Sequence, residues 1–417
     1  MSLFPPKKMA AGALQYALFV SVLIALFLSA FLLFSYMRIT TQNKVSFQLQ
    51  CIQNTDQGFH YMATNKIPYH TKTLVAPTLG TAFSLSKKRW GIFDLLLSES
   101  VVQQKKFKKV GLIGGGQKER PSLYLQERNH PLVLVGNTQI SGKAYLPEKG
   151  VKSGYIGGTS YMGSSLIYGT TALSSPLLPV VENWAHLSRI FGGVPFDGDT
   201  LFFEPSRYDN KVRTFFKEPL VYEQKGPIEL VDLKLTGNFI IRSDTLIRVH
   251  RSALLQDLLL VAPSIEVLSG VRGNFQAMAS ESIRIGSHCD LTYPSGLILT
   301  GMSSEISSEN PQIRIDKNTT VRGVIGYFGQ HQPSHYQPQI VLETHSLVKG
   351  EVYCTGYFEL KGTVLGSVYT GGFIANRLGS IYQNHIYNGA ILSTVLPVQY
   401  AGLILENTNL KIAKWLY

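Results

Sequence analysis

Two histidines, His331 and His335, are the side chains that could most readily bind a metal ion, and they lie in the segment Gly-Gln-His-Gln-Pro-Ser-His-Tyr. Two imidazoles are common ligands of transition metals. Pro333 lies between them and excludes a regular helical pair, and no neighbouring carboxylate or cysteine completes a site, so we predict a surface loop. No Gly-x-Ser-x-Gly motif presents a nucleophilic serine. We therefore predict no catalytic residue, no cofactor-binding residue and no metal ligand, and we expect that the protein is not an enzyme.

Three short motifs have partial matches to known sites. The segment Gly111-Leu-Ile-Gly-Gly-Gly116 resembles a phosphate-binding loop, but no Gly-Lys-Ser/Thr follows it, and we predict a flexible turn. Asn54-Thr55-Asp56 matches one motif of β-helical polygalacturonases, whose paired carboxylates hydrolyse a glycosidic bond. No partner motif accompanies it, so chance is the better explanation. Asp197-Gly198-Asp199 lacks the later ligands of a calcium loop.

The formal net charge of +12 admits a polyanionic partner, because clustered cations attract nucleic acids and anionic surfaces. The densest basic stretch runs from Lys87 to Arg120. No RNA-binding aromatic signature accompanies it, so we expect no nucleic acid. A solvated face, or one near anionic lipid or polymer, is the favoured interpretation. Charged residues make up only 16% of the chain, against about 25% in typical soluble proteins, which favours packed sheet.

Cysteine usage does not define the redox compartment. The three cysteines, Cys51, Cys289 and Cys354, are odd in number and none lies in a Cys-x-x-Cys pair. Cys354 falls in an apolar strand pattern, and we predict that its thiol is buried.

The N-terminal region predicts a membrane anchor. No charged residue occurs from Met9 to Met37, and about 20 apolar residues suffice to cross the hydrocarbon core of a bilayer. A cleaved signal peptide has a shorter apolar region and an Ala-x-Ala-like site, so a retained helix is favoured. Lys7 and Lys8 favour a cytoplasmic N-terminus. We expect a single-pass protein of the inner membrane, with its body in the periplasm.

The sequence of the same region is similar to that of a known family. Lys7-Lys-Met-Ala-Ala-Gly12, followed by Ala13-Leu-Gln-Tyr-Ala17-Leu, resembles the start of atypical minor pilins and K-type minor pseudopilins. In that family a basic leader ends in glycine and is cleaved there, which implies cleavage between Gly12 and Ala13. Ala17 stands where major pilins carry glutamate. An ordinary signal anchor is the alternative.

The rest of the chain predicts a mainly β fold. Short apolar alternations such as Val45, Phe47 and Leu49 indicate strands soon after the helix, and strands of three to five residues recur later at intervals of about 7 to 10 residues. So long an array is typical of a solenoid, in which each turn buries apolar residues against its neighbours. We expect an N-terminal transmembrane α-helix, a small β domain, and a long parallel β-helix with an aromatic-rich insertion. The predicted segments are a cytoplasmic leader at 1–12, the transmembrane helix at 13–37, a small β domain or stalk at 38–120, the first β-solenoid turns at 121–178, the insertion at 179–227, the main β-solenoid at 228–397 and a capping tail at 398–417.

A second resemblance lies near the C-terminus. The recurring Val-x-Gly-like units between Leu347 and Thr370 resemble bactofilins, which are polymer-forming cytoskeletal β-helix proteins. The resemblance implies a narrow β-helix whose glycines permit tight corners.

These observations leave three functional hypotheses open. The leading one is a membrane-anchored scaffold of the cell envelope, whose β-solenoid mediates self-association or partner assembly. The second is a minor pilin-like component of a pilus or secretion machine. The third is a β-helix that binds or processes envelope polysaccharide. The expected partners are the lipid bilayer, further copies of the chain or envelope and pilus assembly proteins, and possible polysaccharide.

Overall fold

The computed structural model describes residues 12–78, 81–117, 119–182, 201–301, 311–330, 336–393, 396–406 and 408–416. The chain divides into two compact units. The first contains Met1–Gly58, Leu74–Ser84 and Ser98–Lys108, and the second contains Phe59–Thr73, Leu85–Leu97 and Lys109–Tyr417. The fold is mainly β, with one long apolar helix at its N-terminal end, as the sequence predicts.

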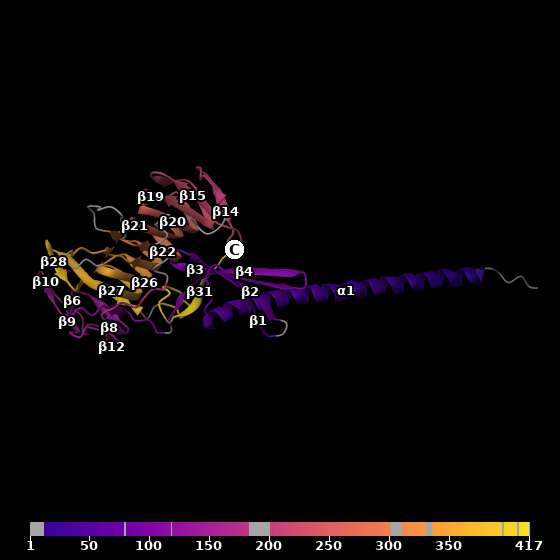
Figure 1. Cartoon of the computed structure of the whole chain (residues 1–417), viewed down its shortest axis with the longest axis horizontal. Helices are drawn as coiled ribbons and strands as arrows, with labels where there is room; N and C mark the ends of the chain where they lie inside the picture. The colour runs from indigo at the N-terminus through magenta and orange to yellow at the C-terminus, as the bar shows by residue number, and fades with distance from the viewer. Residues whose placement is uncertain are drawn as a thin grey trace, which may run out of the picture. The chain divides into compact units, whose positions relative to one another are not determined.

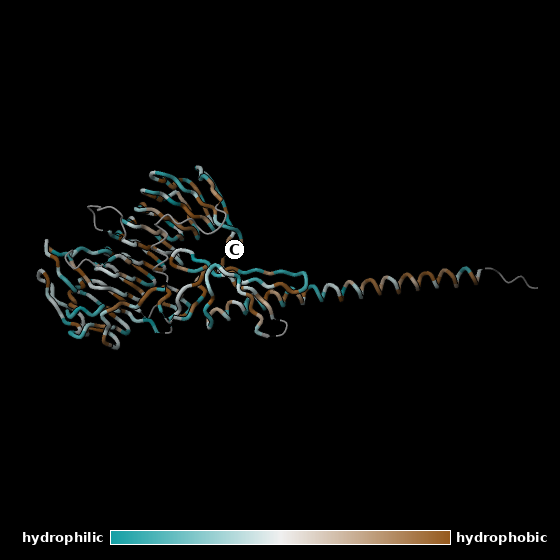
Figure 2. The backbone as a smooth tube through the Cα atoms, in the orientation of Figure 1, coloured by the Kyte–Doolittle hydropathy of each residue, from teal (hydrophilic) through white to brown (hydrophobic). Residues whose placement is uncertain are grey.

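The helix is longer than the sequence suggests. α1 runs from Gly12 to Thr64 over 53 residues, which corresponds to about 80 Å at 1.5 Å per residue. Figure 2 shows that its N-terminal half is hydrophobic. The expected end of the helix at residue 37 and the strands expected near Val45 are therefore wrong. Burial at Cys51, Thr55 and Gly58 follows the three-to-four-residue period of a helix, and this period overrides the short alternation before it.

A five-stranded sheet has the order β1-β2-β3-β4-β31, and Figure 1 labels its strands. The two-residue connections after β2 and after β3 require antiparallel neighbours, because a parallel crossover needs a dozen or more residues. β31 pairs antiparallel with β4, with Asn409 opposite Gly116 and Leu416 opposite Val110. The strand bounds are β1 Lys72–Thr78, β2 Thr81–Trp90, β3 Phe93–Val102, β4 Lys105–Gly116 and β31 Asn409–Leu416.

This pairing has two consequences. Residues 117–408 are inserted between two neighbouring strands of one sheet. The glycine-rich segment Gly111–Gly116 lies within β4, so the predicted flexible turn is wrong. Glycine is required there because a Cβ at Gly115 would lie 1.9 Å from the carbonyl oxygen of Leu403.

The inserted region consists of one closed network of strands that pair mostly in parallel and of two small separate sheets. Its earlier strands are β5 Leu123–Leu125, β6 Leu132–Val135, β7 Gln139–Ser141, β8 Ala144–Leu146, β9 Val151–Ser153, β10 Tyr155–Ile156, β11 Thr159–Ser160, β12 Thr171–Leu173, β13 Leu201–Phe202, β14 Asn210–Arg213, β15 Leu220–Gln224 and β16 Ile228–Leu230. Its later strands are β17 Lys234–Gly237, β18 Phe239–Ser243, β19 Leu246–Val249, β20 Leu254–Val267, β21 Arg272–Ile285, β22 Asp290–Leu299, β23 Gln312–Ile315, β24 Thr320–Tyr327, β25 Ile340–Leu342, β26 Leu347–Leu360, β27 Thr363–Arg377, β28 Ser380–Gln383, β29 His385–Tyr387 and β30 Ala390–Leu392.

The strands align in three rows. β20 pairs with β17 along residues 254–256, with β18 along 259–261 and with β19 along 264–267. We name these the first, second and third rows, and one passage through all three is a layer. In the third row Ile247 lies beside Ile265, which lies beside Ile283. These side chains are buried, so each layer extends an aliphatic column begun by the layer before it.

The order of layers differs from the order along the chain. β5, near the start of the inserted region, pairs in parallel with β27 near its end, and β7 pairs with β30. Residues 123–173 therefore adjoin the last layers. The sequence predicted them at the beginning of the array. In the segment 179–227, which was expected to be an insertion, β14 and β15 pair with β17 and β18 as a further layer, while residues 183–200 lie outside the described ranges.

The C-terminal tail was predicted to cap the array, and that prediction is wrong. The Tyr400 hydroxyl donates to the carbonyl of Gly323, and the Tyr293 hydroxyl donates to the carbonyl of Ala401. The backbone N–H of Leu403 donates to Glu351. Because residues 293, 323 and 351 belong to successive layers, the tail crosses the side of the array and then forms β31.

Candidate assembly helix and buried polar clusters

The N-terminal half of α1 carries a continuous set of exposed apolar side chains. The helix has the length and composition of a membrane span, and no part of its most apolar stretch is buried. A signal sequence has the same two properties. The exposed set comprises Leu14, Tyr16, Leu18, Phe19, Val20, Val22, Leu23, Ile24, Leu26, Phe27, Leu28, Phe31, Leu32, Leu33, Phe34, Tyr36, Met37 and Ile39.

The predicted cleavage position lies at the first described residues of this helix. Gly12 begins α1 and Ala13 is exposed. The basic leader, with Lys7 and Lys8, lies outside the described residues. Cleavage between Gly12 and Ala13 stays a prediction.

Within the first unit, polar contacts attach the C-terminal half of α1 to the strands. The Ser98 hydroxyl donates to the Thr55 carbonyl at 2.9 Å, and the Cys51 thiol donates to the Lys105 carbonyl at 3.3 Å. The Asn54 amide donates to the Ser100 hydroxyl at 3.3 Å. The polygalacturonase-like triplet that begins at Asn54 is thus helical, and its first two residues are buried packing elements.

Within the second unit, the last turns of α1 meet the C-terminal strand. The rings of Phe59 and Trp415 pack edge to face with centroids 4.6 Å apart. The Lys109 ammonium lies 3.8 Å from the centroid of the Trp415 ring, within range of a cation–π contact. A Cβ at Gly111 would approach the Phe59 ring to 3.0 Å, so glycine keeps the strand close to the helix.

A buried ion pair lies beneath the tail. Arg120 Nε is 3.3 Å from Glu351 Oε1, and Glu351 Oε2 accepts the backbone N–H of Leu403 at 2.7 Å. Arg120 also donates to the carbonyl of Tyr400. Burial raises the pKa of Glu351, while the Leu403 N–H and Arg120 act in the opposite direction. Both carboxylate oxygens of Glu351 have partners, which offsets the cost of burying this charge.

Close backbone packing seals this ion pair. Gly350 has φ +151°, and a Cβ there would lie 1.8 Å from the carbonyl oxygen of Gly323 and 2.7 Å from the Tyr400 hydroxyl. Burial raises the pKa of Tyr400 well above its ordinary value, which keeps the phenol protonated as a donor. The arrangement fixes the tail, and the Glu351 side chain has no exposed surface.

A second buried cluster joins β2 and β3. Asp94 has no exposed surface, and it accepts the Tyr69 hydroxyl at 2.7 Å and lies 3.2 Å from the Lys87 ammonium. Burial raises the pKa of Asp94, and burial together with the charge of Asp94 raises the pKa of Tyr69. A phenol with a raised pKa is a poor nucleophile, so this cluster too is best explained as structural.

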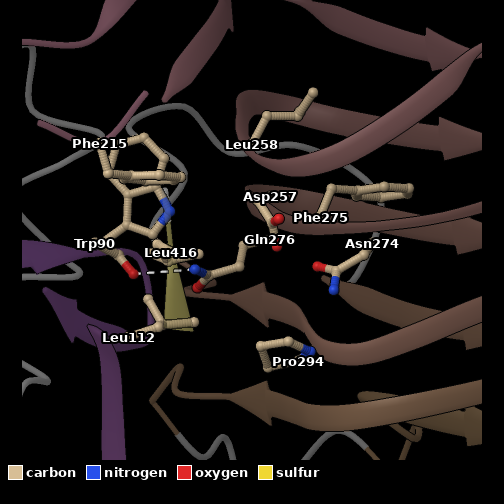
Figure 3. Close-up of a pocket in the computed structure, with 10 residues that line it drawn as sticks. All are labelled: Trp90, Leu112, Phe215, Asp257, Leu258, Asn274, Phe275, Gln276, Pro294 and Leu416. Carbon is tan, nitrogen blue, oxygen red and sulfur yellow. Dashed lines mark hydrogen bonds between the residues drawn. The ribbon is translucent and has the colours of Figure 1, made fainter. Parts of the chain in front are cut away.

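A small cavity lies where the turn between β2 and β3 meets the array (Figure 3). Its volume of about 10 Å³ admits one water molecule. Gln276 accepts the N–H of Ile92 at 2.8 Å and donates to the carbonyl of Trp90 at 3.0 Å, while Phe215 packs edge to face on Trp90. These side chains hold the turn, and the cavity is too small for an organic ligand.

The histidines and cysteines considered in the sequence can also be checked against the structure. His331 and His335 lie outside the described residues. Among the residues that the structure describes, no group of three His, Cys, Asp or Glu side chains could hold a metal ion. Cys354 is buried and free, which confirms that prediction, and Cys51 and Cys289 are also buried. Sequence reasoning missed the Arg120–Glu351 pair because its members lie 231 residues apart.

No family model matches the chain, and no curated protein matches it in sequence. Among solved structures, the competence-associated pilin ComZ from Thermus thermophilus is 9% identical, with a TM-score of 0.21, over 89% of this chain and 97% of that one. A TM-score this low carries no argument about fold or function. The comparisons contain no support for a relationship to bactofilins.

Proposed function

We propose that the protein is a membrane-anchored, pilin-like structural subunit whose exposed apolar helix packs among other apolar helices. One observation carries the proposal. α1 continues without a break from its exposed apolar half into the half that packs on the strands of the first unit. A simple anchor needs only about 20 residues and tolerates a loose linker. A continuous helix instead transmits a fixed orientation from the membrane segment to the strands, which suits a subunit of an ordered assembly.

In this proposal the inserted region is a parallel β-helix that the assembly displays. The support is the three-row register, in which each strand lies beside a strand one layer away. β26 and β27 pair with Gly350 opposite Gly366, within the segment that resembles bactofilins. Polymerisation of the bactofilin kind stays a prediction from that resemblance. We further propose that the anchor lies in an inner membrane with the body in the periplasm, and that the chain is not an enzyme, since the buried carboxylates of Glu351 and Asp94 are already partnered.

Two measurements test the pilin-like role. Mass determination of the membrane-extracted protein is expected to give a mature N-terminus at Ala13, and an intact Met1 would contradict processing. Single cysteines at Leu18 or Phe27, on an otherwise cysteine-free background, are expected to cross-link to a neighbouring helix in native membranes. A cysteine at the exposed position Val398 of the tail serves as the matched control. Equal cross-linking at all three positions would contradict packing through α1.

The second candidate is an envelope scaffold that self-associates through its body. It is favoured by the number of layers that the parallel register links, from β13 at one end of the pairing to β8 and β12 at the other. Sedimentation of the full chain in detergent separates the two candidates. Association that persists when Phe27, Phe31 and Phe34 are replaced by serine favours the body as the interface. Association that is lost favours α1.

A further inference from the structure

The first row of strands presents two outward columns of side chains. Leu235, Leu255, Leu291, Val321 and Val348 point inward and are buried. The residues on either side of each therefore point outward, because side chains alternate along a strand. We name this surface the basic face and define it as residues 234–236, 254–256, 272–274, 290–292, 320–322, 347–349 and 363–365.

The basic face has an excess of positive charge. Lys234 and Arg272 are exposed and Lys349 is half-buried, and none of them forms an ion pair with the residues that the structure describes. Arg322 is paired with Asp290, which is the only carboxylate among the residues that define this face. The basic face thus carries four cations and one carboxylate.

The third row shows that this excess is local. There, Arg248 lies between Glu229 and Glu266, at 2.7 Å from a carboxylate oxygen of each. Further along, Lys361 is 3.3 Å from both Glu343 and Glu359. Arg284 lies beside Arg314 in that row, and both are within 3.5 Å of Asp316. The cations of the third row therefore have carboxylate partners that offset their charge. The first row therefore attracts a polyanion more strongly than the third row does.

Several of the remaining outward side chains of the basic face donate and accept hydrogen bonds, whereas Leu254, Leu347 and Leu365 are apolar. Thr236 lies beside Gln256 in one column, and Thr320 follows Asp290 in the other. Thr292 and Gln256 are exposed, and Thr363 is half-buried. No aromatic side chain occurs among the residues that define the face. Proteins that bind single-stranded nucleic acid stack bases on aromatic rings, so this composition disfavours such a ligand.

We propose that the basic face binds a linear acidic polysaccharide along the direction in which the layers stack. Neighbouring layers repeat at about 4.8 Å, so the seven layers from Lys234 to Thr363 extend over about 29 Å. A chain of uronic acid residues presents carboxylates to Lys and Arg, and hydroxyls to Thr and Gln. Charge-assisted bonds from Arg and Lys to carboxylates are the strongest of these contacts. This inference is independent of the packing proposed for α1.

The test measures binding of the full chain, solubilised in detergent, to sodium polygalacturonate. The combined variant Lys234→Gln, Arg272→Gln and Lys349→Gln is expected to weaken binding about tenfold at low salt, because each side chain loses a charge-assisted bond. The matched control replaces three exposed lysines elsewhere, Lys149→Gln, Lys152→Gln and Lys225→Gln, and removes the same charge. An equal loss of binding in the control would overturn the proposal.

A second variant separates recognition of sugar from general attraction of anions. Thr320→Val with Thr363→Val keeps the charge and the shape but removes two hydroxyls, and we expect binding of polygalacturonate to fall about threefold. Neutral dextran is expected not to bind. Double-stranded DNA is the competing polyanion, and its binding depends on phosphate contacts and salt. If DNA binds more tightly than polygalacturonate, or the threonine variant binds as the wild type does, the proposal is wrong.

Discussion

The backbone N–H of Leu403 donates a hydrogen bond to the carboxylate of Glu351 over 2.7 Å, across 52 residues of sequence. The same carboxylate is paired with Arg120, so one buried side chain connects the start of the inserted region, an inner strand and the returning tail. The fixed course of the tail therefore depends on a charge that is fully buried.

Replacing Glu351 tests this dependence. We expect Glu351→Ala to lower the free energy of unfolding by about 3 to 5 kcal/mol, because it leaves the buried guanidinium of Arg120 without its partner. Glu351→Gln keeps the shape and an acceptor, and a smaller loss is expected. Denaturant unfolding of the full chain in detergent measures both. Equal stability of Glu351→Ala and wild type would show that the pair does not hold the tail.

The close approach of neighbouring layers at Gly350 gives a second prediction. We expect Gly350→Ala to cost about 3 kcal/mol, because its Cβ would overlap the Gly323 carbonyl and its φ is positive. Gly226→Ala is the control. Its φ of +93° is also unfavourable, but a Cβ there meets open space, so about 1 kcal/mol is expected. Thermal unfolding of the two variants isolates the contact from the backbone strain.

Gln276 holds the turn between β2 and β3 through two hydrogen bonds. We expect Gln276→Ala to destabilise the protein by about 1 to 3 kcal/mol, since the buried N–H of Ile92 and the carbonyl of Trp90 lose their partner. Gln256→Ala, at an exposed position of the first row, is expected to change stability by less than about 0.5 kcal/mol. Similar losses in both variants would contradict a specific role for Gln276.

His385 predicts a dependence of stability on pH. Burial lowers the pKa of His385 below its ordinary value of 6.5, and the charge of Lys152 adds to this effect. The unfolded chain then binds a proton more readily than the folded one. Stability from this group is fully present above pH 6.5 and is lost as the pH falls through 6.5 towards the folded-state pKa.

Two variants check this sign. His385→Gln is expected to flatten the fall in stability below pH 6.5, and Lys152→Gln is expected to make that fall shallower by removing the neighbouring positive charge. Unfolding midpoints measured across the pH range report both. Identical slopes in the wild type and His385→Gln would exclude the histidine as the cause.

The sequence predicts the parts of this fold that depend on local patterns. The uncharged stretch from Met9 to Met37 is sufficient to predict an apolar helix, and the recurring short strands predict a mainly β body. The continuation of α1 to Thr64 was missed, because Val45, Phe47 and Leu49 alternate as in a strand. The burial at Cys51, Thr55 and Gly58 has helical spacing, but it arises only when the strands pack on that face of the helix.

Pairing between distant segments was not predictable in the same way. A repeating apolar pattern shows that layers exist, but it does not specify which layers are neighbours. β5 therefore pairs with β27 without any local signal for it. β4 and β31 likewise meet across nearly the whole inserted region. The Arg120–Glu351 pair depends on both of these arrangements, so it could not be found from residue spacing.

The antiparallel pairing of Asn409 with Gly116 brings the entry and exit of the inserted region together on adjacent strands. The region between them is attached at two neighbouring strands of one sheet. The length of this region therefore does not affect the spacing of the two strands. Whole layers could be gained or lost in related chains while the helix and its sheet keep their geometry, which makes the body free to diversify.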